Sequence, residues 1–154
     1  MKVPEARRNH HATVVVLGSH GVFIEGASGT GKTQLALRLL RFANAGGRLA
    51  RLVADDQVFL AARHGRLVAT CPPSIKGLVE ARGFGPAPIT AEPGAVIDLV
   101  VRLAEPPVPR LDEGRMRELC GLALPMLTLA ARDPAAANAI LARLGVDPFC
   151  DGSG

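Results

Sequence analysis

A glycine-rich segment of eight residues is the strongest chemical signal in the sequence. It runs Gly26-Ala27-Ser28-Gly29-Thr30-Gly31-Lys32-Thr33 and matches GxxxxGK[ST] at every fixed position. In this pattern the backbone N–H groups form a nest for phosphate oxygens. The lysine reaches the β- and γ-phosphates, and the final hydroxyl ligates Mg²⁺. Because the segment follows a strand-like stretch and opens an amphipathic one, all eight residues are predicted to bind a nucleoside triphosphate.

Two adjacent carboxylates, Asp55 and Asp56, follow the apolar segment 51–54. Successive side chains of an extended chain point to opposite faces, so both can enter one site only if the strand ends or bends there. One carboxylate could then hold the metal or its water while the other accepts a proton from an incoming hydroxyl. The residues alone leave open which does which, and whether Asp56 merely solvates a strand end.

Two further pairs of polar residues carry weaker signals. His10 and His11 precede the first apolar segment, and Glu80 and Arg82 lie in the glycine-rich stretch VEARGFG. Lone histidines are more often incidental than functional. The second pair, taken alone, indicates a surface loop with a salt bridge. Neither pair is assigned a role by its position alone.

The elements that would position these residues follow from periodicity and turn signals. Strands are predicted at 12–17, 22–25, 51–54, 58–61, 67–70 and 95–103, and helices at 34–43, 112–124 and from 133 to about 145. The glycines around Ser19 predict a hairpin between the first two strands, and the glycines and prolines of 83–88 predict a loop. The chain is predicted to be one domain, 1–154, with a loose leader over 1–10 and a flexible tail over 146–154. Interleaved strands and helices with an opening hairpin indicate an α/β fold with a mixed sheet.

Composition excludes several classes of protein. The net charge is only +4, the 18 basic residues are scattered, and Trp and Tyr are absent. This composition lacks the clustered charge and the stacking side chains of nucleic-acid-binding proteins. The three cysteines show no zinc-like spacing and indicate free thiols in a reducing compartment. The longest apolar stretch, 121–131, is about half the ~20 residues of a membrane span. A cytoplasmic protein without nucleic-acid or membrane partners is therefore expected.

Four pieces of the sequence, in order, resemble the catalytic domain of HPr kinase/phosphorylase. They are His11, GASGTGKT, LVADD and VEARGFG, which together span residues 11–85. This bacterial family phosphorylates a serine of HPr, the phosphocarrier of the sugar phosphotransferase system. The resemblance implies a P-loop-containing mixed sheet flanked by helices, similar to phosphoenolpyruvate carboxykinase, and assembly as a hexamer. The chain begins almost at the catalytic core, so a compact form without the N-terminal domain of longer members is expected.

The resemblance also implies roles for individual residues. Lys32 would contact the nucleotide phosphates, and Thr33, Glu80 and Asp56 would serve the Mg²⁺ site. Asp55 would be the general base toward the serine hydroxyl, with His11 close to it and Asp56 adjacent. The implied catalytic set is therefore Asp55, His11, Lys32 and Asp56, with ATP and Mg²⁺ as cofactors and Arg82 in the signature loop.

The chain departs from the family downstream. An arginine-bearing segment that the family links to removing phosphate from phospho-HPr is replaced by EPPVPRLDEGR, where neither Arg110 nor Arg115 falls in a match. Near the end, LPMLTLAARD is only loosely similar to the family's Pro-Gly-Arg-Asn. The predicted function is an ATP- and Mg²⁺-dependent serine kinase acting on HPr and regulating the phosphotransferase system, with the phosphorylase direction in doubt. Two alternatives stay open: a nucleotide-sensing module that has lost its chemistry, and a small-molecule P-loop kinase. The span between Arg82 and Arg102 holds no basic residue that could form an arginine-bearing lid for the latter.

Overall fold

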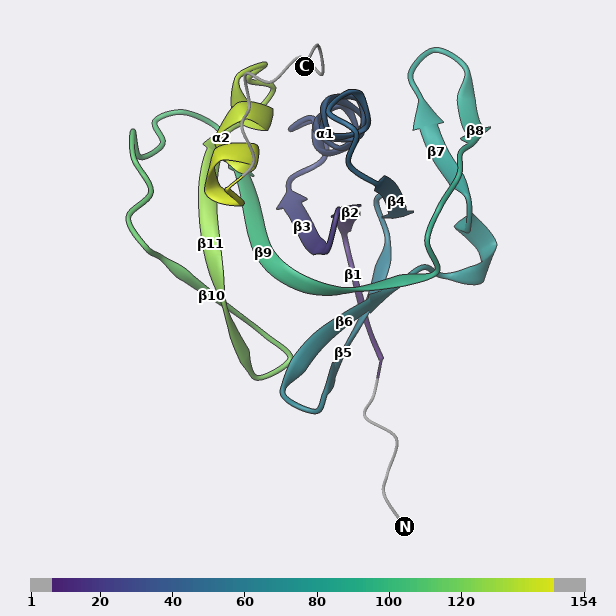
Figure 1. Ribbon diagram of the computed structural model, residues 1–154, viewed down its shortest axis with the longest axis horizontal. Helices are drawn as coiled ribbons and strands as arrows, with labels where there is room; N and C mark the ends of the chain where they lie inside the picture. The colour runs from purple at the N-terminus through teal and green to yellow at the C-terminus, as the bar shows by residue number, and fades with distance from the viewer. Residues whose placement is uncertain (1–6, 146–154) are drawn as a thin grey trace.

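A strongly bent mixed sheet forms the centre of the computed structural model, which describes residues 7–145 (Figure 1). Its nine strands run in the order β1-β5-β6-β9-β3-β2-β4, with β11 beside β9 and β10 beside β11. Strands β7 and β8 form a separate two-stranded sheet. The strands are β1 Arg8–His10, β2 Ala12–Leu17, β3 His20–Gly26, β4 Ala50–Ala54, β5 Val58–Arg63, β6 Arg66–Thr70, β7 Leu78–Ala81, β8 Gly85–Pro88, β9 Gly94–Ala104, β10 Met116–Leu119 and β11 Leu122–Ala130. The helices are α1 Lys32–Ala45 and α2 Ala136–Arg143, with a short 3₁₀ turn, η1, at Pro73–Ile75.

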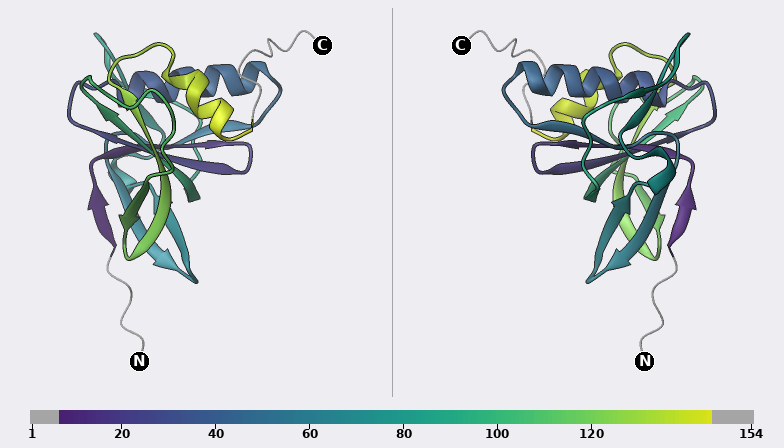
Figure 2. Two further views of the ribbon diagram at one scale, coloured as in Figure 1. Left: turned by 90° about the vertical axis from the view of Figure 1, so that its left-hand side faces the viewer. Right: turned by 90° about the vertical axis from the view of Figure 1, so that its right-hand side faces the viewer.

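The sheet has apolar side chains on both faces, and each face is covered differently. Helices α1 and α2 cover one face, while the bent part of the sheet that contains β5, β6 and β10 packs on the other (Figure 2). Because side chains alternate along a strand, Ile24 of β3 joins the helical layer and Phe23 joins the opposite layer. The predicted mixed sheet with flanking helices is confirmed, with both helices on the same face.

Parallel pairing in the middle of the sheet creates the edge that carries the site. Strand β9 pairs in parallel with β3 on one side and with β11 on the other, whereas β2 and β3 form the predicted antiparallel hairpin. The carboxyl ends of β3, β9 and β11 therefore meet at one edge. In open α/β sheets this is the edge at which ligands bind.

Helix α1 follows β3 directly and packs against β2, β3 and β4. Of the three residues predicted to mark its apolar face, Leu35 and Leu39 are buried, but Phe42 is 43% exposed. Leu40 and Ala43 complete the buried face instead. The helix ends at Gly46, as its glycine pair predicts.

The helix predicted over 112–124 is wrong, because this segment forms the hairpin β10–β11. Cys120 and Gly121 both have positive φ, 50° and 76°, which is the two-residue turn that matches the twist of paired strands. Pro125 lies where β11 ends its pairing with β10 and begins its pairing with β9 at Met126. A missing N–H is tolerated at such a change of partner, so the proline does not interrupt the strand.

Three smaller expectations also need correction. Residues 85–88, predicted as loop, form β8 and pair with β7, where Pro86 and Pro88 are accommodated because β8 is an edge strand. Part of the predicted leader, residues 8–10, forms β1 and pairs with β5. Helix α2 begins at Ala136 and not at Asp133, whose Oδ1 accepts a hydrogen bond from the Ala135 N–H in the turn before it.

The remaining predicted ends, residues 1–6 and the tail 146–154, lie outside the described residues. Between residues 7 and 145, no helix is both long enough and apolar enough to cross a bilayer.

Candidate active site

The glycine-rich loop connects the end of β3 to the start of α1, as its context predicts. At Gly26 an added Cβ would lie 2.7 Å from the Thr30 hydroxyl and 2.9 Å from the Leu103 carbonyl oxygen, so no side chain fits there. Gly31 caps α1 with φ 93°, a left-handed conformation that favours glycine. The loop therefore turns tightly and presents the N-terminal end of α1, which favours anions.

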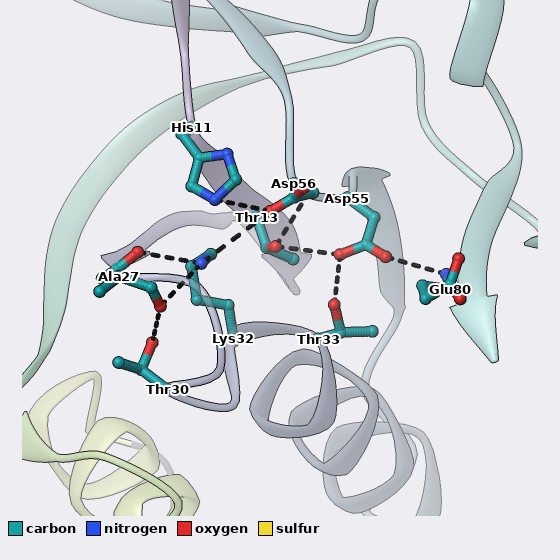
Figure 3. A network of polar contacts seen from close by, with 10 residues as sticks. His11, Thr13, Ala27, Thr30, Lys32, Thr33, Asp55, Asp56 and Glu80 are labelled. Atoms are coloured by element: carbon teal, nitrogen blue, oxygen red, sulfur yellow. Dashed lines mark hydrogen bonds and ion pairs between the residues drawn. The ribbon is translucent and has the colours of Figure 1, made fainter. Parts of the chain in front are cut away.

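Lys32 is almost fully buried, at 6% exposure. Its Nζ donates hydrogen bonds to the carbonyl oxygens of Gly26, at 2.9 Å, and Ala27, at 3.3 Å (Figure 3). The Thr30 hydroxyl also donates to the Ala27 carbonyl, at 2.7 Å. These bonds hold the Lys32 side chain against the loop, with its ammonium group beside the Gly26 and Ala27 carbonyl oxygens.

A cavity of about 890 Å³ opens over the loop and the first turns of α1. It is lined by loop residues, by the acidic pair and by residues from β7–β8 and the link between β11 and α2. Its polar lining residues include Ser28, Lys32, Thr33, Gln34, Arg38, Asp55, Asp56, Glu80, Arg82, Arg132 and Asp133. Sites for nucleotide-sized ligands have volumes in this range.

Asp55 is buried, at 8% exposure, and both oxygens of its carboxylate accept hydrogen bonds. Oδ1 accepts from the hydroxyls of Thr13, at 3.0 Å, and Thr33, at 2.7 Å, and Oδ2 accepts from the Glu80 N–H, at 3.0 Å (Figure 3). The bond from Thr33 orients the hydroxyl at the end of the P-loop. Asp55 therefore ties three separate elements, β2, α1 and β7, to the end of β4.

Asp56 lies in a different environment, although it is the next residue. The chain leaves β4 after Ala54 and takes a left-handed conformation at Asp56, with φ 68°. Its N–H donates to the Thr13 hydroxyl at 3.2 Å, and its side chain is 56% exposed. The Asp56 Oδ1 lies 3.0 Å from His11 Nε2 and 3.9 Å from Lys32 Nζ (Figure 3). The bend predicted as necessary for both carboxylates to enter one site is thus present.

His11 contacts the side chain of Asp56. The family resemblance instead implies that His11 lies close to Asp55. This matters for the division of labour between the two carboxylates. Both Asp55 oxygens already accept hydrogen bonds, whereas Asp56 is exposed toward the cavity with an imidazole and an ammonium group beside it. The geometry is that of a buried, hydrogen-bonded carboxylate next to an exposed one.

The oxygen donors at this point suit a Mg²⁺–triphosphate complex. The Thr33 hydroxyl donates its hydrogen bond to Asp55, so the lone pairs of the hydroxyl oxygen can face a cation. Glu80 and Asp56 line the same cavity. The described residues contain no cluster of three or more His, Cys, Asp or Glu side chains that could hold a metal by themselves. Mg²⁺ does not need one, because it is usually bound by one or two carboxylates, water and substrate phosphates.

The structure brings all the predicted site residues to this edge of the sheet and leaves two arginines away from it. Arg82, of the signature loop, lines the cavity beside Gly83. Arg110 and Arg115 do not line it, and Arg115 pairs with Glu113 at 3.0 Å. Neither arginine contributes to the site in this structure.

Two residues of the site were missed at the sequence level. Thr13 is fully buried in β2 and links Asp55 to Asp56 through its hydroxyl. The only signal for it is a single polar residue inside the apolar run ATVVVL. Arg132 contacts the loop from the far end of the chain, and its signal is only the loose likeness of LPMLTLAARD to the family ending.

We expect Asp55→Asn to lower the free energy of unfolding by about 1–3 kcal/mol, because the amide NH₂ would face a hydrogen-bond donor and leave buried groups unpaired. Urea denaturation at pH 7 measures this. Asp98→Asn is the matched control, since an asparagine oxygen can still accept from the Gly21 N–H at the opposite end of the sheet. Equal stability of the two variants would contradict the network at Asp55.

His10, beside the site, should make stability depend on pH. Its ring packs edge-on against Phe23, and its Nε2 is buried without a hydrogen-bond partner among the described residues. Burial, and then the positive charge of Arg117, lower the pKa of His10 below its ordinary value of 6.5. The unfolded chain therefore takes up this proton first, so stability present above about pH 6.5 is lost as the pH falls below it.

The measurement is urea denaturation between pH 7 and 5 for wild type and His10→Gln. We expect a smaller loss of stability on acidification in the variant. His64→Asn, in an exposed turn, serves as the control that leaves the slope unchanged. An identical slope in His10→Gln would contradict the lowered pKa of His10.

Comparison with known proteins agrees with this geometry. Residues 3–136 match the family model of the HPr serine kinase C-terminal domain. The chain is 42% identical over 80 residues to an HPr kinase/phosphorylase of Limosilactobacillus reuteri, a match covering 51% of this chain and 23% of that protein. It is 30% identical over 141 residues to one from Lactobacillus acidophilus, covering 82% of this chain and 42% of that protein. The chain thus matches less than half the length of these relatives.

A solved structure shows the same fold. The HPr(Ser) kinase/phosphatase from Coxiella burnetii superposes with a TM-score of 0.74 at 23% sequence identity, covering 90% of this chain and 95% of the other. The shared fold is the P-loop-containing mixed sheet flanked by helices that the family resemblance implies. The family match over most of the sequence, together with this shared fold, shows that the chain belongs to the HPr serine kinase C-terminal domain family.

Proposed function

We propose that this chain is an ATP- and Mg²⁺-dependent protein serine kinase whose acceptor is HPr or a close homologue. The observation that carries the proposal is the pair of carboxylates with separate environments beside a P-loop lysine. Asp55 is buried with both carboxylate oxygens hydrogen-bonded, and Asp56 is exposed beside His11 and Lys32. Phosphoryl transfer to a hydroxyl needs both a fixed phosphate site and a free base, and these residues supply them.

In the proposed reaction, Asp56 is the general base and Asp55 a positioning residue. This assignment exchanges the roles that the family resemblance implies for the two. An Asp56 oxygen takes the proton of the serine hydroxyl as the serine oxygen forms a bond to the γ-phosphorus. The bond between that phosphorus and the β–γ bridging oxygen breaks, and ADP leaves. His11 holds Asp56 in place through the contact between Nε2 and Oδ1.

The rest of the site prepares the phosphates for this step. The loop N–H groups and Lys32 would bind the β- and γ-phosphates, and Thr33 and Glu80, which line the same cavity, would serve the Mg²⁺ site. Bound Mg²⁺ neutralises charge that develops on the phosphate oxygens. Because Asp55 accepts a hydrogen bond from the Thr33 hydroxyl, it orients that hydroxyl for the metal site without touching the acceptor.

The wider role rests on the family. We propose that the protein acts in the cytoplasm, in a hexameric assembly, as a regulator of the phosphotransferase system. The position of Arg110 and Arg115 away from the cavity supports the kinase direction over the phosphorylase direction.

Incubation with ATP labelled at the γ-phosphate tests the proposal against its alternatives. We expect label on an HPr-type phosphocarrier in the presence of Mg²⁺ and none with EDTA. ATP binding without transfer to any acceptor would indicate a nucleotide-sensing module. Label on a small-molecule hydroxyl compound and not on the phosphocarrier would indicate a small-molecule kinase. Either result would overturn the proposed function.

A further inference from the structure

Arg132, in the link between β11 and α2, contacts the phosphate loop through both its backbone and its side chain. Its N–H donates to the Thr30 carbonyl at 2.9 Å, and its Nη1 donates to the Gly29 carbonyl at 2.9 Å. It lies far from the loop in sequence and takes no part in the reaction proposed above. The two bonds nevertheless fall on consecutive residues at the apex of the loop.

The backbone conformation at Arg132 directs its N–H toward the loop. Its φ is 59°, a left-handed conformation that is uncommon for any residue other than glycine. The preceding residue, Ala131, donates to the Ala104 carbonyl at the end of β9, and Asp133 accepts from Ala135 at the entrance to α2. The conformation at Arg132 is therefore fixed from both sides, and it directs the N–H toward the loop.

The guanidinium group is also held by an acidic partner on the outside. Nη2 donates to both oxygens of Glu105, at 2.8 and 2.7 Å, while Nη1 bonds Gly29. Both side chains are more than half exposed, so the ion pair itself adds little stability. Its effect is geometric, because it fixes the plane of the guanidinium group. Arg132 lines the cavity and Glu105 does not, so the arginine stands between the acid and the cavity.

The elements that lead to Arg132 and to Asp56 lie on opposite sides of helix α1 (Figure 1). Figure 1 shows β11 and α2 on one side of α1 and β4, which leads to Asp56, on the other. In phosphoryl transfer the attacking and leaving oxygens are roughly in line through the phosphorus. With the acceptor beside Asp56, the leaving nucleoside diphosphate must extend toward the side that carries Arg132.

We propose that Arg132 is a positioning residue for the nucleoside diphosphate part of the donor. By bonding the Gly29 and Thr30 carbonyl oxygens it keeps these two oxygens from facing the phosphates. Its positive charge stands at the rim where the leaving diphosphate lies. Glu105 orients the guanidinium group from outside. The inference rests on the proposed function, because it assumes that the loop holds a nucleotide donor.

The test measures the affinities of Mg·ADP and Mg·ATP in the absence of any acceptor, using fluorescent N-methylanthraniloyl derivatives. For Arg132→Gln we expect both affinities to fall about tenfold and to the same extent, because the residue serves the part that ADP and ATP share. Arg132→Lys should recover part of the loss, since an ammonium can still donate to Gly29. Arg115→Gln removes another exposed Arg–Glu pair and is the matched control, with unchanged affinities.

Thermal unfolding without nucleotide separates positioning from general damage to the fold. We expect midpoints of Arg132→Gln and Arg115→Gln to agree within about 2 °C. Unchanged ADP affinity in Arg132→Gln, or a loss confined to ATP, would overturn the inference. Wild type that binds nucleotide but does not phosphorylate HPr would overturn the proposed function alone. Wild type that binds neither nucleotide would overturn both.

Discussion

Asp56→Asn is expected to lower the rate of phosphotransfer to HPr by about 10²–10⁴-fold, the range that general acid–base groups contribute. An amide cannot take the serine proton. It keeps the size of the side chain, and its oxygen can still accept a hydrogen bond from His11 Nε2. Because the side chain is 56% exposed and buries no hydrogen bond, the fold should be unaffected. Mg·ATP affinity should stay within about threefold, so the loss appears in kcat and not in KM.

The matched control is Asp98→Asn. Asp98 also lies beside a histidine, with Oδ2 3.8 Å from His20 Nδ1, at the end of the β2–β3 hairpin away from the loop. Its substitution should leave kcat unchanged. Near wild-type turnover in Asp56→Asn would remove Asp56 from the chemistry. If Asp55→Asn then lost turnover at full stability, the base would be Asp55, as the family resemblance implies.

Lys32→Ala is expected to lower both the affinity for Mg·ATP and the rate of phosphotransfer, whereas Asp56→Asn lowers only the rate. Lys32 Nζ is buried inside the curve of the loop, where it would face the β- and γ-phosphates. Removing one such preorganised donor typically costs about 10²–10³ in kcat. The affinity for Mg·ATP should fall as well, because the ammonium group binds the donor in the ground state. Steady-state kinetics and nucleotide titration together measure the two losses.

Lys76→Ala controls for the loss of a positive charge, since Lys76 is exposed and does not line the cavity. We expect it to behave as wild type. Unchanged ATP affinity in Lys32→Ala would contradict the assignment of the glycine-rich segment as a nucleotide site.

The parts of the fold that local chemistry determines were predictable. The loop residues Gly26 to Thr33 form a pattern whose glycines are required at fixed positions, and the strand before it and helix after it are present. The β2–β3 hairpin and the turn at His64-Gly65 follow from short-range turn signals. In each case a few adjacent residues contain the whole physical reason.

The errors arose where distant pairing decides the structure. The segment 116–130 has an apolar pattern compatible with a helix or with strands, and its pairing with β9 selects the strands. Pro125 is a residue typical of a helix end, but in this strand it marks the change of partner from β10 to β9. The prolines of β8 are likewise typical of a loop, and only the pairing with β7 shows that they occupy an edge strand.

The different environments of Asp55 and Asp56 could not be predicted from the sequence, for a related reason. It depends on the left-handed conformation at Asp56 and on the buried hydroxyl of Thr13, which contacts both residues from β2. Neither feature has a local pattern. Arg132 reaches the loop only because β9 and β11 run parallel and end at the same edge of the sheet.

The central claim is that this chain transfers the γ-phosphoryl group of ATP to a serine of HPr, with Asp56 as base. Intact-mass and fragmentation mass spectrometry of an HPr-type phosphocarrier, after incubation with Mg·ATP and either wild type or Asp56→Asn, tests it most directly. We expect one added phosphoryl group, located on a serine, with wild type and none with the variant over the same time. Unmodified phosphocarrier with wild type, or equal modification by the variant, would contradict it.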